Sequence, residues 1–349
     1  MSQSPQSLGY RQPAEWHPHH TCWLAFPSHG DLWLEYLPVV QREFVDLAKA
    51  IAASEPIQVL VLPETAALAA EMLQGVAVTF HEIPFGDIWM RDITPIFTRN
   101  AATQTVAGLK FQWNGWGGKY LLDHDDQVAD RVINAAQVAR FSFDYVLEGG
   151  AVEVDGLGTC LTTKQCLLNP NRHDGNYDHE NGNAQRTQNQ IETDLKQALG
   201  VEKVLWIESG LLNDHTDGHI DTIARFIAPH TVMCMATDDP EDPNAAVLAD
   251  IAAQLASFTD AQGKPLQVVK IPSPGLVLDP EGEIMPASYL NFYIANGAVI
   301  VPTYDSPYDV MAVNMIGQYF PDRQTIGLSA KHILLGGGAF HCITCHQPL

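Results

Sequence analysis

A polar motif set against a pair of apolar strands occurs five times along this chain, and no other sequence feature constrains the fold as strongly. One case is Glu148-Gly149-Gly150, which is followed by the apolar run AVEV (151–154), a glycine-containing turn and the run TCLTT (159–163). The last case, 336–342, is cut short near the end of the chain. We expect its missing strand partner to be the N-terminal run TCWLAF (21–26). Strands that alternate with helical patterns predict α/β architecture.

The spacing of the motifs indicates structural repeats. One residue from each motif serves as a marker, and successive markers lie 51 to 72 residues apart. The five markers are Asp92, Glu148, His219, Asn291 and Cys342. Helical patterns fall between several of them, at 125–139, 187–199, 244–258 and 307–318. Units of this size suggest repeats around an axis, with all markers facing one centre. The alternative is a run of ordinary α/β hairpins.

Length and composition leave the domain count open. A chain of 349 residues with 46% hydrophobic content can form two domains or one large domain of repeated units. Residues 1–20 are polar, contain proline and carry three histidines, 17, 19 and 20. Without cysteine or aspartate partners at ligand spacing, we expect this segment to be a solvated N-terminal loop and not a metal site.

Charge and cysteine usage narrow the class of protein. The formal net charge is −22, which repels nucleic acid and favours small cations, although acidic proteins are often just soluble ones. The six cysteines are scattered, which suits a reducing cytoplasm. The first residues show no signal peptide, and no apolar run reaches 18 residues, so we expect neither export nor a membrane partner. Homo-oligomerisation is left open.

Cys342 can be interpreted in four ways. It can be a catalytic thiolate, half of a redox Cys-x-x-Cys pair with Cys345, a haem attachment site in Cys-x-x-Cys-His, or a packed thiol. Covalent haem attachment normally requires export, which makes that interpretation the weakest. Three glycines, 336–338, precede the motif and allow the backbone to approach another group closely.

The other markers suggest what such a thiol would attack. A thiol with a pKa near about 8.5 needs a cation or a base to become a nucleophile. Asp92, Glu148 and Asp221 would be costly to bury together unless a cation lies between them. A planar guanidinium matches carboxylates in pairs, and His219 can transfer protons near neutral pH. Together these residues predict nucleophilic substitution at a guanidine or amidine carbon.

Several motifs resemble those of the agmatine deiminase family, which includes the bacterial peptidyl-arginine deiminases. They are WMRD (89–92), WGGK (116–119), EGG (148–150), CLLNPNR (166–172), TDGHID (216–221), ASYLNFYIANG (287–297) and GGGxxHCIT (336–344). The resemblance spans nearly the whole chain, with the motifs in order. It implies an α/β five-unit propeller with pseudo-fivefold symmetry, formed by one catalytic domain over residues 1–349, with a central active site, no metal and no cofactor.

The resemblance also implies a role for each site residue. Cys342 would be the nucleophile, and His219 would protonate departing ammonia and then activate water. Asp92 and Asp221 would bind the guanidinium nitrogens, and Glu148 would hold the cation and His219. Trp89 would line the substrate channel.

The implied substrate is agmatine, which would pass through an S-alkylthiouronium intermediate to N-carbamoylputrescine and ammonia. Ala151 and Ala339 replace residues that are commonly polar in the family. They keep other hypotheses open: a deiminase of arginine or peptidyl-arginine, and a catalytically impaired protein that binds a guanidino ligand. An amidinotransferase is a weaker third option.

Overall fold

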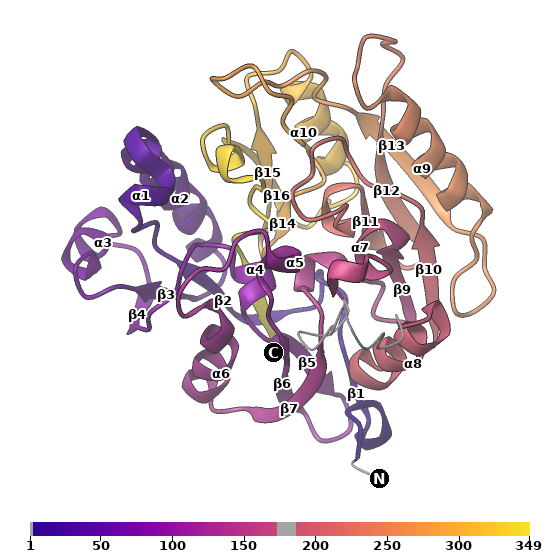
Figure 1. The fold of residues 1–349 in the computed structure, drawn as a ribbon, viewed down its shortest axis with the longest axis horizontal. Coiled ribbons are helices and arrows are strands. Elements are labelled where there is room, and N and C mark those ends of the chain that lie inside the picture. The colour runs from indigo at the N-terminus through magenta and orange to yellow at the C-terminus, as the bar shows by residue number, and fades with distance from the viewer. Residues whose placement is uncertain (1–2, 173–185) are drawn as a thin grey trace, which may run out of the picture.

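Five separate sheets make up the strand framework. The computed structural model describes residues 3–172 and 186–349, and within them three sheets have three strands and two have four. Helices alternate with the strands along the chain, so the α/β class predicted from the sequence is confirmed. In Figure 1 the longer helices lie on the outside of the molecule, and the sheets lie inside them.

One sheet illustrates the pattern that all five share. Strands β5 (Ile96–Asn100) and β6 (Thr105–Gln112) form an antiparallel pair, and β6 pairs in parallel with β7 (Ala139–Val146). Helix α6 (Asp125–Ala136) lies in the connection between β6 and β7. A parallel pair needs such a crossover, whereas the antiparallel pair needs only a short turn.

Three further sheets repeat this order of elements. They consist of β8 (Glu153–Val154), β9 (Thr159–Thr163), α8 (Gln188–Leu199) and β10 (Lys203–Ile207); of β11 (Ala224–Ala228), β12 (Thr231–Ala236), α9 (Ala245–Ser257) and β13 (Gln267–Pro272); and of β14 (Tyr293–Ile294), β15 (Ala298–Thr303), α10 (Asp309–Gly317) and β16 (Gln324–Ser329). In each, the first two strands are antiparallel and the last two are parallel.

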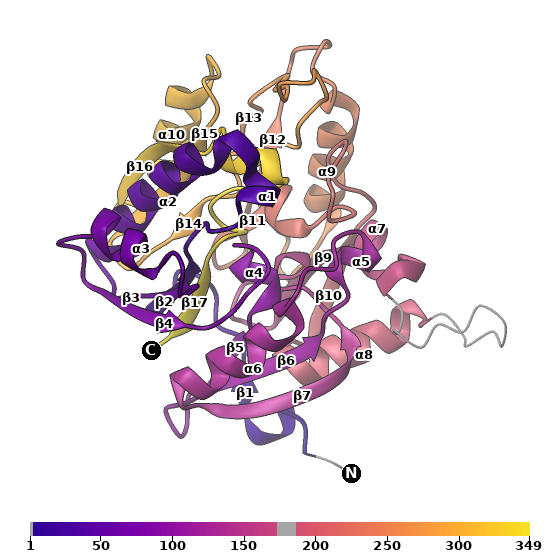
Figure 2. The ribbon, with the colours of Figure 1, turned by 60° about the vertical axis from the view of Figure 1, so that its left-hand side comes forward.

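The fifth sheet joins the two ends of the chain. Strand β17 (Cys345–Pro348) pairs antiparallel with β2 (His19–Ala25), with Cys345 opposite Trp23. Strand β2 then continues in parallel to β3 (Ile57–Val61) and β4 (Val78–Glu82), with α2 (Leu37–Ala52) and α3 (Ala66–Met72) in the connections. Figure 2 shows β17 and the C-terminus in this sheet. The prediction that the N-terminal run supplies the missing strand is confirmed.

Burial explains why these sequences form these elements. All five residues of β9 are buried. A strand covered on both faces exposes no side chain, so its residues are apolar or have their polar groups hydrogen-bonded. Helix α2 is amphipathic and buries one side, including Val40, Phe44, Leu47 and Ile51, at helical spacing. The predicted helix at 125–139 ends earlier, because Gln137 adopts a left-handed conformation (φ 55°) and β7 begins at Ala139.

Three of the sequence motifs form short helical turns. Helix α4 (Met90–Ile93) precedes β5, the 3-10 turn η3 (Gly149–Ala151) precedes β8, and η5 (Ile220–Thr222) precedes β11. The turn η6 (Ile333–Gly336) leads into the segment that ends at β17. Each of these motifs therefore lies just before the antiparallel strand pair of its sheet, and this position determines where its side chains lie.

Part of the predicted N-terminal loop, residues 1–20, has regular structure. It contains the turn η1 (Gln6–Leu8) and strand β1 (Tyr10–Arg11), which pairs with β5, and β2 already begins at His19. Glu15 of this segment is buried, and its carboxylate forms ion pairs with Arg91 and Arg225 from distant parts of the chain.

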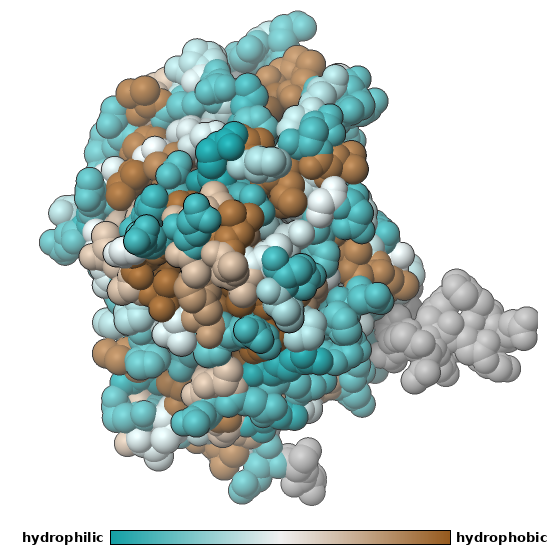
Figure 3. Space-filling model, turned by 90° about the vertical axis from the view of Figure 1, so that its left-hand side faces the viewer, coloured by the Kyte–Doolittle hydropathy of each residue, from teal (hydrophilic) through white to brown (hydrophobic). Residues whose placement is uncertain are grey.

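The surface agrees with the charge of the sequence. On the face turned to the viewer in Figure 3, hydrophilic residues surround apolar ones that gather near its middle. In the described ranges 3–172 and 186–349, every helix is too short or too polar to cross a bilayer.

Candidate active site

Two of the three glycines before Cys342 make room for an indole ring. A Cβ atom on Gly336 would lie 2.5 Å from Trp89 Cζ2, and one on Gly338 would lie 2.7 Å from Trp89 Cζ3. Gly337 adopts φ 99°, a left-handed conformation that favours glycine. The predicted close approach of the backbone to another group is therefore an approach to Trp89.

Asn291 positions the thiol of Cys342. Its side-chain Nδ2 lies 3.1 Å from Cys342 Sγ and donates a hydrogen bond to the sulfur. Its Oδ1 accepts the backbone N–H groups of Ala339, His341 and Cys342 at 3.0–3.3 Å. One amide thus fixes the backbone that carries the sulfur and also contacts the sulfur itself.

Asp221 lies directly beside the thiol. The Cys342 S–H donates to Asp221 Oδ2 at 3.6 Å, and both residues are buried. Burial, followed by the negative charges of Asp221 and Asp92, raises the pKa of Cys342 well above its ordinary value. The sulfur therefore keeps its proton in the absence of a cation, and a cation at this place would stabilise the thiolate.

Gly150 lies at the point where the other site residues meet. A Cβ atom there would lie 2.6 Å from His219 Nδ1, 3.0 Å from Asp92 Oδ1 and 3.2 Å from Asp221 Oδ2. The Gly150 N–H donates to Asp92 Oδ1 at 2.9 Å. The second glycine of the EGG motif is needed because a histidine and two carboxylates surround its α-carbon.

The indole of Trp116 holds the second oxygen of Asp92. Its Nε1–H donates to Asp92 Oδ2 at 2.9 Å, and His219 Nδ1 lies 3.7 Å from the same oxygen. Burial raises the pKa of Asp92, the negative charges of Asp221 and Glu148 add to the rise, and His219 opposes it.

The surroundings of His219 favour its charged form. Burial disfavours the imidazolium, but Asp92, Cys166 and Glu148 outweigh burial and raise the pKa well above its ordinary value. A histidine that holds its proton at neutral pH is suited to act as a general acid.

Four buried polar atoms around the site have no hydrogen-bond partner in the described part of the chain. They are Glu148 Oε2, Asp221 Oδ1, His219 Nδ1 and His219 Nε2. Buried polar atoms are nearly always satisfied, so these atoms indicate a place for a ligand. Two carboxylate acceptors suit the N–H donors of a guanidinium.

Glu148 is held by a cation that the sequence analysis missed. Arg172 Nε donates to Glu148 Oε1 at 2.7 Å, and its Nη1 donates to Asp217 Oδ2 at 2.5 Å. Asp217 has φ 64° and also binds Lys119, so it supports the turn before His219. The CLLNPNR motif, which contains Arg172, was the signal that could have identified this residue.

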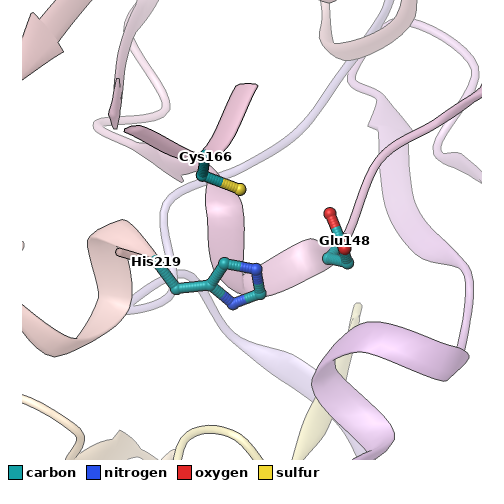
Figure 4. A group of neighbouring side chains, drawn as sticks. All are labelled: Glu148, Cys166 and His219. Carbon is teal, nitrogen blue, oxygen red and sulfur yellow. The ribbon is translucent and has the colours of Figure 1, made fainter. Parts of the chain in front are cut away.

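Glu148, Cys166 and His219 form a compact cluster (Figure 4). One ligand atom from each lies within 4.8 Å of the others, and all three residues are buried. Sulfur, nitrogen and oxygen donors of this kind suit Zn²⁺. However, Arg172 already neutralises Glu148, and burial raises the pKa of the Cys166 thiol, which opposes the thiolate that a metal needs. The expectation of a metal-free site stays a prediction.

A cavity of about 210 Å³ opens onto the thiol. Its walls include Trp89, Asp92, Trp116, Tyr120, His215 and Cys342. Asp87 also lines it and accepts hydrogen bonds from the indole N–H groups of Trp33 and Trp89. The expected channel residue, Trp89, is therefore a wall of the cavity that contains the nucleophile candidate.

The remaining cysteine of the C-terminal motif is a packed thiol. Cys345 is buried on β17, and its S–H donates to the Pro95 carbonyl at 3.6 Å. All six cysteines lie in the described ranges and are free thiols. The packing of Cys345 agrees with the interpretation of this residue as a structural neighbour.

Known proteins match the chain over its whole length. The family model described as Porphyromonas-type peptidyl-arginine deiminase matches residues 11–348. A putative agmatine deiminase of Legionella pneumophila (strain Paris) is 37% identical and covers 100% of this chain and 98% of the relative. An agmatine deiminase of Stutzerimonas stutzeri is 35% identical and covers 100% of this chain and 98% of the relative.

Solved structures show the same similarity. The agmatine deiminase of Enterococcus faecalis superimposes with a TM-score of 0.92 at 34% identity, covering 100% of this chain and 98% of the other. A C. jejuni agmatine deiminase with substrate bound gives a TM-score of 0.86 at 26% identity, over 97% and 96% of the two chains.

Proposed function

We propose that this chain, which belongs to the Porphyromonas-type peptidyl-arginine deiminase family, is a hydrolase that converts agmatine and water to N-carbamoylputrescine and ammonia. One observation supports the chemistry most directly. The Cys342 thiol lies 3.6 Å from Asp221, and Asp92, Asp221 and His219 all surround the α-carbon of Gly150. This grouping fits one guanidinium, which offers N–H donors to the carboxylates while its carbon faces the sulfur.

The first half of the reaction forms a covalent intermediate. Asp92 and Asp221 bind the guanidinium, and its charge lowers the pKa of the Cys342 thiol. The sulfur bonds to the guanidinium carbon, the C–N bond breaks, and ammonia leaves with a proton from His219. The thiol proton passes to the departing ammonia, which leaves as ammonium, so His219 is left neutral and the S-alkylthiouronium carries the single positive charge of the guanidinium.

The second half releases the ureido product. His219 takes a proton from water, the oxygen bonds to the same carbon, and the C–S bond breaks. The sulfur takes up the remaining hydroxyl proton and His219 keeps the proton taken from water, which returns both groups to their starting forms. Glu148, fixed by Arg172, keeps its second oxygen available to the cation and to His219.

The surroundings support a small cationic substrate. The cavity of about 210 Å³ has aromatic walls and is also lined by the carboxylates of Asp87 and Asp92. This size favours agmatine over a peptidyl arginine. The net charge of −22 agrees with a cationic ligand and disfavours nucleic acid.

We further propose that the five sheets are five units of one β/α propeller around this site, within a single domain. Support comes from the shared pattern of an antiparallel pair followed by a parallel pair in every sheet. A cytoplasmic location is supported by six cysteines that occur as thiols, the form that a reducing compartment maintains.

The function is tested by incubating the protein with agmatine, free arginine and an arginyl peptide and measuring ureido product and ammonia. We expect turnover of agmatine above the other two. Cys342→Ala should abolish turnover, whereas Cys345→Ala, which alters a buried thiol three residues away, should retain it. No turnover of any guanidino compound would refute the enzyme hypothesis and support a binding protein. Full activity of Cys342→Ala would refute the mechanism.

A further inference from the structure

We propose that Glu15, in the N-terminal segment, is a positioning residue for the deimination reaction and acts through His341 on Asp221. The inference rests on the proposed function, because Asp221 is the carboxylate beside the nucleophile. It assigns a role to the part of the chain that the sequence analysis treated as a loop.

Glu15 is the centre of a buried charge cluster. Its Oε2 lies 2.7 Å from His341 Nε2, 3.0 Å from Arg225 Nη2, 3.5 Å from Arg91 Nη2 and 3.9 Å from His346 Nδ1. Its Oε1 accepts the backbone N–H of Ile294 at 2.8 Å. Burial opposes ionisation, but Arg225, His341 and Arg91 outweigh it and hold the pKa of Glu15 well below its usual range.

His341 connects this cluster to the active site. Its Nε2 faces Glu15 and its Nδ1 faces Asp221 Oδ2, both at 2.7 Å. A ring that meets a carboxylate at each nitrogen needs two N–H donors, which only the imidazolium provides. Burial raises the pKa of Asp221, but the hydrogen bond and charge of His341 outweigh it, followed by His219 and Arg225, so that the pKa is lowered.

The consequence for Asp221 is a fixed and charged carboxylate. His341 occupies Oδ2 from one side, the Cys342 thiol approaches Oδ2 at 3.6 Å, and Oδ1 stays free to accept a substrate N–H. The same cluster holds the backbone of the nucleophile. The Arg91 side chain donates to the His341 carbonyl at 3.2 Å, and the Arg91 N–H donates to the Cys342 carbonyl at 3.0 Å.

Glu15→Gln separates a charge relay from a simple field effect by the direction of a pKa change. If Glu15 acts through His341, the neutral amide no longer stabilises the imidazolium, Asp221 loses its cation, and its pKa rises. If Glu15 acts only as a distant negative charge, its removal lowers the pKa of Asp221. The ionisable groups that face Asp221 are His341, His219, Arg225, Cys342 and Asp92. Glu15→Gln replaces none of these five residues.

The matched control is Glu55→Gln. Glu55 is also buried, faces a histidine (His19 Nδ1 at 3.2 Å) and accepts a backbone N–H (Asn296 at 2.7 Å). Its hydrogen-bond partners His19, Tyr293 and Asn296 do not line the cavity at Cys342. A loss that reflects only a missing buried carboxylate would occur in both variants. A loss of kcat/KM caused by breaking the relay through His341 would occur in Glu15→Gln alone.

The experiment measures kcat/KM for agmatine against pH in the wild type, Glu15→Gln, Glu55→Gln, His341→Gln and the double variant Glu15→Gln/His341→Gln. We expect Glu15→Gln to lower kcat/KM by roughly 100-fold, the order that a 1 Å misplacement costs. Its acid limb should move to higher pH, as it should in His341→Gln, and the double variant should add little. The proposal would be overturned if the acid limb of the pH profile of Glu15→Gln stayed in place or moved to lower pH. It would also be overturned if the losses of kcat/KM in the two single variants added up in the double variant.

A second readout does not depend on turnover. In protein labelled with 15N in histidine, the ring resonances of His341 can be assigned by their loss in His341→Gln. We expect two protonated nitrogens at pH 7 in the wild type and one in Glu15→Gln. A neutral ring in the wild type would overturn the proposal even if Glu15→Gln did not fold. Absence of wild-type turnover would instead refute the proposed function and leave this test in force.

Discussion

Replacing Gly150 with alanine adds one methyl group at the point where three site residues meet. The backbone of Gly150 tolerates the change, because this residue is not among those with positive φ. The new Cβ would lie 2.6 Å from His219 Nδ1 and 3.0 Å from Asp92 Oδ1. The perturbation is therefore steric and confined to the site.

The expected size of the effect follows from these distances. An ordinary contact for a Cβ begins at 3.4 Å, so the imidazole must move by about 0.8 Å, and the Asp92 oxygen by about half as much. A displacement near 1 Å costs roughly 100-fold in rate, or about 2.7 kcal/mol of transition-state stabilisation. Overpacking a buried site costs about 1–3 kcal/mol of folding free energy. We therefore expect Gly150→Ala to fold and to lose about two orders of magnitude in kcat/KM.

The assay measures kcat/KM for agmatine from ureido product and compares it with the urea midpoint from circular dichroism. Gly30→Ala is the control, because a Cβ there meets only Leu37 Cδ2, at 3.9 Å. It should match the wild type in both measurements. If Gly150→Ala folds and keeps activity within threefold of the wild type, the packing of His219 and Asp92 around Gly150 does not position them for catalysis.

Three further predictions concern buried groups around the site. Asn291→Ala leaves the backbone N–H groups of Ala339 and Cys342 without their acceptor, whereas the His341 N–H keeps the Asn291 backbone carbonyl at 3.0 Å. Urea unfolding should therefore show a loss of about 1–3 kcal/mol and the rate at Cys342 should fall; an unchanged midpoint would contradict this. Arg172→Met leaves Glu148 as an unpaired buried charge and should cost about 3–5 kcal/mol, largely recovered when Glu148→Gln is added; no recovery would argue against the pair. Burial raises the pKa of Asp125 to about 7, so the stability that its protonated form contributes is present below about pH 4 and is lost as pH rises through 7. Asp125→Asn should therefore gain stability relative to the wild type as the pH rises from about 4 to about 7, by at most about 1.4 kcal/mol per pH unit, and a difference independent of pH would refute the assignment.

Most strands and helices were predictable because their signals are local. The runs TCLTT (159–163) and TVMCMA (231–236) match β9 and β12 residue for residue, since each is an apolar run bounded by turn residues. The Asn296-Gly297 turn lies between antiparallel strands β14 and β15. The burial of Glu15 could not be predicted, because its charged partners Arg225 and His341 lie far away in the sequence.

The sequence indicated the residues of the candidate site but not the hydrogen bonds that join them to their partners. Residue type and motif spacing indicated a cysteine, a histidine and carboxylates, because nucleophilic attack on a guanidinium needs those groups. Nothing local to Glu148 indicates that Arg172 holds it, and nothing local to His341 indicates that it joins two carboxylates. Such partners are chosen by packing and charge compensation between distant segments.

The sequence by itself determined the units of this protein and the chemistry they carry. Apolar periodicity, turn glycines and five recurring motifs follow from short-range preferences that can be read along the chain. Only the tertiary structure decided which groups share a charge or a proton. It places Glu15 326 positions before His341 in the chain and 2.7 Å from it in space, and His341 at the same distance from Asp221. The physical reason is that a buried charge must find its counter-charge wherever the fold brings one, and sequence distance does not enter that requirement.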